Sequence, residues 1–75
     1  MSDSGDVVKA FGDGVREMRQ RRGMSQDQLA GLSDLYATYL NEIERGKRNP
    51  SLRVVVRILD ALECSLEEII QRPQR

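Results

Sequence analysis

Histidine is absent from this 75-residue sequence, and cysteine occurs only once, at Cys64. One thiol without histidine cannot supply the four ligands of a structural zinc site, and it cannot form an intramolecular disulfide. The same absences exclude histidine-based general bases and the nucleophile arrangements that depend on them. We therefore predict that the chain is not an enzyme, binds no metal and needs no cofactor.

Long apolar runs are also missing, because no stretch approaches the roughly 20 residues that a membrane-spanning helix requires. Residues 1–6 are acidic and poor in apolar side chains, which is not the pattern of a secretory signal peptide. Together with the lone cysteine, these features lead us to expect a soluble cytoplasmic protein with no membrane partner.

Aromatic residues make up only 4% of the sequence, so its core must be built from leucine, valine, isoleucine and methionine. A composition of 39% hydrophobic and 32% charged residues is that of a globular protein. The length allows one small domain. We predict a single domain over residues 1–75, with a core at about residues 7–71 and flexible ends.

The formal net charge is zero, but the charges are unevenly distributed along the chain. Residues 16–22 contain four arginines against one acid, and residues 26–44 contain four acids and no base. Residues 45–57 contain five bases and no acid. This distribution fits either ordinary solvated helix faces or a local basic surface for nucleic acid.

Apolar residues recur at helical spacing, and polar residues mark where the helices begin. Ser25 with Gln28 and Ser65 with Glu68 form two capping boxes, and Gly23 follows a basic last turn. In the first predicted helix the apolar residues at this spacing are Val7, Phe11, Val15 and Met18. In the fourth they are Leu52, Val55, Ile58, Leu59 and Leu62. The predicted helices cover about residues 7–22, 25–32, 36–45, 51–62 and 65–70. The fold class is therefore all-α, a compact five-helix bundle.

Three segments carry a resemblance to a known family: residues 25–30 (SQDQLA), 39–52 (YLNEIERGKRNPSL) and 58–66 (ILDALECSL). Together they resemble the XRE (Cro-like phage repressor) helix-turn-helix family over roughly residues 11–70. The block 43–52 is the most specific part. The resemblance implies a lambda-repressor-like domain in which helix 25–32 crosses the DNA backbone and helix 36–45 enters the major groove.

By this resemblance, the base-reading positions of the recognition helix fall on Ala37, Thr38, Asn41 and Glu42. Thr38 can hydrogen-bond to a base or touch a thymine methyl, whereas Ala37 can make only apolar contact. Asn41 can pair with adenine or hold a phosphate. Glu42 can accept from cytosine N4, or it can be a surface partner of Arg45.

The resemblance places DNA-backbone contacts at Gln26 and in the basic loop after the recognition helix. Tyr39 can reach a phosphate through its hydroxyl or serve mainly as a core residue. The expected backbone contacts are Gln26, Tyr39, Arg45, Lys47, Arg48 and Asn49.

In the resembled repressors, an arginine of the first helix pairs with the glutamate of the Ile-Glu-x-Gly motif, and the matching residues are Arg19 and Glu44. This ion pair is expected to be structural. Four residues depart from the family pattern: Asp34 replaces a turn glycine, Tyr36 replaces a Ser or Thr cap, Glu63 replaces a glycine after the fourth helix, and Cys64 replaces a buried valine. Because of that position, Cys64 is expected to be a small core residue and not a redox group.

These features favour a sequence-specific DNA-binding transcriptional regulator that binds double-stranded DNA as a homodimer on a pseudo-palindrome. The expected dimer interface contains Val56, Leu66, Ile69 and Ile70. The alternative is a protein-interaction module of the antitoxin or adaptor type that kept the fold without specific DNA binding. The operator, the regulated gene and any contact with RNA polymerase are not readable from the sequence.

Overall fold

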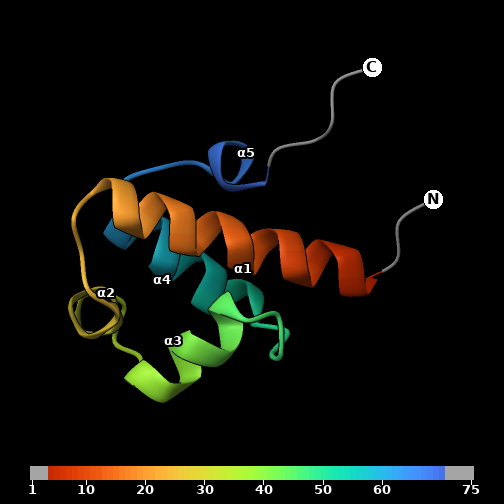
Figure 1. The fold of residues 1–75 in the computed structure, drawn as a ribbon, viewed down its shortest axis with the longest axis horizontal. Coiled ribbons are helices and arrows are strands. Elements are labelled where there is room, and N and C mark those ends of the chain that lie inside the picture. The colour runs from red at the N-terminus through yellow and green to blue at the C-terminus, as the bar shows by residue number, and fades with distance from the viewer. Residues whose placement is uncertain (1–3, 71–75) are drawn as a thin grey trace.

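The computed structural model describes residues 4–70 of the chain, and these residues form five helices and no strand (Figure 1). The all-α prediction is therefore correct. The first helix starts three residues earlier than its apolar stripe indicated, and residue 71 of the expected core lies outside the described residues. The helices are α1 (Ser4–Arg21), α2 (Gln26–Ser33), α3 (Ala37–Glu44), α4 (Leu52–Leu62) and α5 (Leu66–Ile69).

Helix α1 is the central element, with α5 against one side and α3 against another (Figure 1). Two glycines permit this close packing. A Cβ at Gly12 would clash with the Ile43 carbonyl oxygen, and one at Gly14 would clash with the carbonyl oxygen and side chain of Ile69. The backbones of α3 and α5 therefore approach α1 more closely than any residue with a side chain would allow.

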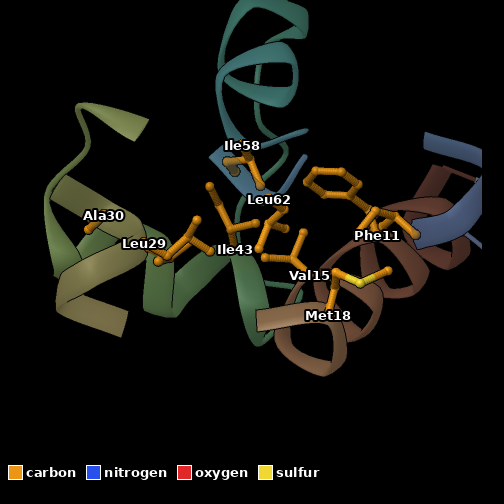
Figure 2. Close-up of a cluster of buried hydrophobic side chains, with 10 residues drawn as sticks. Phe11, Val15, Met18, Leu29, Ala30, Ile43, Ile58 and Leu62 are labelled. Carbon is orange, nitrogen blue, oxygen red and sulfur yellow. The ribbon is translucent and has the colours of Figure 1, made fainter. Parts of the chain in front are cut away.

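The core is formed by side chains from all five helices, several of which point toward one another in Figure 2. Two residues assigned to the core stripes lie outside it. Val7 is 49% exposed near the start of α1, and Leu52 is 79% exposed as the first residue of α4. Both lie near the start of a helix and line the same open surface hollow. The buried apolar residues are Phe11, Val15, Met18, Leu29, Ala30, Leu40, Ile43, Ile58, Leu62 and Ile69.

Serine caps begin three of the helices, as the sequence indicated. The hydroxyls of Ser25 and Ser65 accept from backbone N–H groups of the third helical residue, which completes both capping boxes. Ser51 accepts from Val54 N–H at 3.2 Å. These bonds satisfy N–H groups that have no partner within the helix, and they fix where α2, α4 and α5 start.

Two non-glycine residues adopt the left-handed conformation after their helices, Asp34 with φ 58° and Glu63 with φ 54°. The next residues close the turns, because Leu35 N–H donates to the Ala30 carbonyl and Cys64 N–H to the Leu59 carbonyl. Both substitutions for glycine thus keep the glycine-type turn. Ser33, expected in the turn, is instead the buried last residue of α2.

Cys64 is partly buried against the core, which agrees with its predicted role as a small core residue. Burial raises the pKa of its thiol, and this outweighs the opposing effect of the Arg22 charge. None of the described helices is both long enough and apolar enough to cross a membrane. Within residues 4–70, no cluster of His, Cys, Asp and Glu side chains could hold a metal ion.

Candidate nucleic-acid interface

Helix α3 is short, and its position is fixed by one buried face that runs from its middle to its end. Leu40, Ile43 and Glu44 are buried, whereas its N-terminal residue Ala37 is only partly buried. Tyr36 precedes the helix in an extended conformation, makes no side-chain cap and is 84% exposed. Tyr36 and Thr38 are thus exposed at the start of α3, and the start of a recognition helix is the part that approaches base edges.

A buried ion pair joins α1 to the end of α3 and brings together the two residues that the resemblance pairs. Arg19 Nε donates to Glu44 Oε2 at 2.7 Å, and its Nη2 donates to Oε1 at 3.0 Å. The exposed fractions are 9% for Arg19 and 4% for Glu44. Arg19 Nη1 also donates to the Met24 carbonyl at 2.9 Å. The two-point contact therefore fixes both the position and the rotation of α3 against α1.

The same carboxylate extends the network to α2, a connection that the sequence analysis did not predict. Gln26 Nε2 donates to Glu44 Oε1 at 3.0 Å, and Asn41 Nδ2 donates to Gln26 Oε1 at 3.4 Å. Glu44 therefore links α1, α2 and α3, and it fixes the angle of the helix-turn-helix pair. The sequence held no signal for this link, because it depends on side-chain rotamers across three helices.

A polar surface hollow of about 440 Å³ lies over this network. Because an amide nitrogen has two donors, Gln26 keeps one for a ligand while it bonds to Glu44. Exposed arginines of α1 and of the loop after α3 reach the same hollow, and the carboxylates of Asp13 and Glu44 line it too. The polar lining includes Arg16, Gln20, Gln26, Asn41 and Arg45.

The residues expected to read bases lie on α3 with different exposures. Thr38 is exposed, whereas Asn41 and Glu42 are partly exposed. Ala37 is partly buried and packs against the core, so less of its methyl group is available to a base. Thr38 is therefore the most accessible of the four.

The loop after α3 turns sharply at Gly46, whose φ is +73°. Its side chains Arg45, Lys47, Arg48 and Asn49 are all exposed, as a backbone-contacting loop requires. Tyr39 is partly buried against the core, which supports a core role for its ring. The Arg48 guanidinium lies over that ring, with its Cζ 5.4 Å from the ring centroid.

Glu42 does not pair with Arg45, which corrects that alternative. It accepts instead from Arg48 Nε at 2.8 Å. The loop brings residue 48 back beside α3, because Lys47 N–H donates to the Glu42 carbonyl at 2.9 Å. Sequence spacing favoured Arg45, which is nearer in the chain, because helical periodicity does not indicate that the loop returns to α3.

Three of the four residues expected at a dimer interface are accessible. Val56 is 48% exposed, Leu66 is 44% exposed and Ile70 is partly exposed. Ile69 is only 3% exposed and packs in the protomer's own core beside Gly14. Ile69 is therefore the least available of the four to a second copy, and the interface itself stays a prediction.

A family model described as helix-turn-helix matches residues 15–69 of the chain. The chain belongs to the XRE-type helix-turn-helix family. Within this family it is 33% identical over 67 residues to Control protein C.SmaI of Serratia marcescens, covering 89% of this chain and 80% of that one. It is 41% identical over 61 residues to Control protein C.BamHI of Bacillus amyloliquefaciens, covering 80% and 75%.

A solved structure agrees with this placement. The restriction-modification controller protein C.AhdI of Aeromonas hydrophila superimposes with a TM-score of 0.80 and 38% sequence identity, covering 85% of this chain and 97% of that one. The five-helix arrangement is thus shared by a family member over nearly its whole length. In family terms, α2 and α3 are the helix-turn-helix pair, and α3 is its second, recognition helix.

Proposed function

We propose that the protein is a sequence-specific DNA-binding transcriptional regulator that binds a pseudo-palindromic operator as a homodimer. One observation carries this proposal: the buried Arg19–Glu44 pair holds α3 with Thr38 exposed near its N-terminus and a basic loop beside it. Such a helix can lie in the major groove while the loop holds phosphates. In this proposal, Thr38, Asn41 and Glu42 face base edges, and Gln26, Arg45, Lys47 and Arg48 contact the backbone.

We further propose that the regulator is of the controller type found in restriction–modification systems. C.SmaI and C.BamHI, both control proteins, are matched over 80% and 75% of their lengths. By contrast, the regulator PuuR of Escherichia coli is matched over only 39% of its length. Matches to control proteins over most of their length support the controller type.

Selection of bound sites from random duplex DNA tests whether α3 contacts the bases and the loop after it contacts the DNA backbone. Thr38→Ala should cost on the order of 1–3 kcal/mol on the preferred site and relax the preference at one position per half-site. Lys47→Ala should weaken binding to all sequences alike and reduce the slope of log affinity against log salt by about one unit per protomer. The selected half-sites should have centres about 10–11 base pairs apart.

Two results would contradict this proposal. If Thr38→Ala weakens every sequence equally while Lys47→Ala changes the preferred base, the roles of helix and loop are reversed. If the wild-type protein binds no duplex DNA in a salt-dependent way, it is not a DNA-binding regulator. That second result would favour the interaction-module alternative, to which the zero net charge and the acidic segment 26–44 already point.

A further inference from the structure

The Arg48 side chain is already occupied within the protein, although it belongs to the loop proposed to contact phosphates. Its Nε donates to Glu42 Oε1 at 2.8 Å, and its guanidinium stacks over the Tyr39 ring. The side chains of Arg48 and Glu42 remain 56% and 44% exposed. The ion pair is therefore at the surface, where a DNA phosphate can compete with the carboxylate.

Glu42 occupies an unfavourable position for a DNA-binding surface. It follows Thr38 by four residues on α3, so the two side chains lie on the same face of the helix. A helix that enters the groove with this face brings a carboxylate toward the phosphates, and like charges repel. In the free protein the carboxylate is balanced by Arg48, whereas Lys47 makes no ion pair within residues 4–70.

We propose that Glu42 is an internal counter-ion of Arg48 that limits binding to DNA lacking a specific site. The proposal rests on the function proposed above. Non-specific binding consists of phosphate contacts alone. A phosphate that binds Arg48 must first displace the Glu42 carboxylate, so this contact gains less than one made by an unpaired base. Glu42 is thus a specificity-determining residue that acts through Arg48.

The test measures affinity for duplex DNA of mixed sequence, with the full chain, across a series of salt concentrations. Glu42→Gln keeps the size of the side chain but removes its charge, and it should raise this affinity about threefold to tenfold at low salt. The gain should shrink as salt increases, because screening weakens both the ion pair and the phosphate contact. Circular dichroism of the variant shows whether the helical fold is kept.

Asp60→Asn is the matched control, because it removes one negative charge from an exposed residue of α4 and leaves the Glu42–Arg48 pair intact. It should change the affinity for mixed-sequence DNA less than twofold. An equal gain from both variants would overturn the proposal, since net charge alone would then explain it.

A second background decides whether Glu42 acts through Arg48. In Arg48→Gln protein, adding Glu42→Gln should give a clearly smaller gain than it gives in the wild type. The same gain in both backgrounds would overturn the proposal, because Glu42 would then repel phosphates directly. If wild-type protein binds DNA and Glu42→Gln leaves its non-specific affinity unchanged, this inference alone fails. If wild-type protein binds no DNA, the proposed function fails with it.

Discussion

Arg19 and Glu44 show how one buried pair can determine the geometry of a surface. Arg19 donates three hydrogen bonds, two to the Glu44 carboxylate and one to the Met24 carbonyl. Glu44 Oε1 also accepts a hydrogen bond from Gln26. Because both charges are removed from water, neither is tolerated alone. Their positions were readable from the motif resemblance. The hydrogen bonds of Gln26 and Asn41 were not predictable from the sequence, because a side-chain amide can bond to water just as well as to another residue.

Glu44→Gln should therefore lower the free energy of unfolding by about 3 kcal/mol, because it leaves the Arg19 charge buried without its counter-ion. Urea denaturation followed by circular dichroism measures the change. Glu17→Gln is the control, since Glu17 and Arg21 form an exposed pair one helical turn apart on α1. That variant should cost less than about 0.5 kcal/mol. Equal losses from the two variants would show that burial of the Arg19–Glu44 pair has no energetic consequence.

At the scale of elements, apolar periodicity and capping predicted all five helices, but not how closely they pack. Serine caps and the stripe of α4 are local signals, and the structure places these elements where the signals do. Gly12 and Gly14 lie inside α1, where glycine ordinarily weakens a helix. Tertiary packing requires glycine at both positions, because the backbones of α3 and α5 lie where a Cβ atom would be. No local pattern carries that information.

Alanine at these glycines should therefore destabilise the protein, although alanine is the better helix former. Gly12→Ala and Gly14→Ala should each lower the free energy of unfolding by at least about 1–3 kcal/mol, because the neighbouring backbone must shift. Gly31→Ala provides the control. Gly31 lies in α2 with open space around it, and alanine there should add about 0.5–1 kcal/mol of stability. A stabilising effect at all three positions would show that α1 is not tightly packed.

The molecule as a whole is small, with a longest extent of 36 Å, close to the roughly 34 Å of one DNA turn. One copy presents one recognition helix, so reading two half-sites requires a second copy. Four of the exposed large apolar residues, Val7, Leu52, Val56 and Leu66, lie on α1, α4 and α5, whereas Leu32 lies on α2 and Tyr36 just before α3. A shallow apolar hollow of about 160 Å³ is lined by Val7, Val8, Phe11, Asn49, Pro50, Leu52, Val55, Leu66 and Ile70. From the sequence, most of these residues were predicted only as apolar helix faces that pack in the core. Helical periodicity cannot distinguish an apolar face that packs within one protomer from one that packs against a second copy.

We expect the protein to dimerise through this surface and the adjoining Val56. Leu66→Glu places a charge at an apolar residue that is 44% exposed, and it should weaken self-association at least about tenfold. Glutamate is well tolerated in the first turn of a helix, so α5 should still form. Sedimentation equilibrium across micromolar concentrations gives the dimer constant. Affinity for a full pseudo-palindromic site should fall with it, whereas binding to a single half-site should not.

Leu32→Glu separates this effect from a general cost of adding charge. Leu32 is 65% exposed on α2 and does not line the apolar hollow. Its replacement should leave the dimer constant within about twofold of the wild type, since it lies outside the proposed interface. If Leu32→Glu dissociates the dimer and Leu66→Glu does not, the two copies meet through α2. The recognition helices would then not be spaced by an α4–α5 interface, and the expected half-site separation would lose its basis.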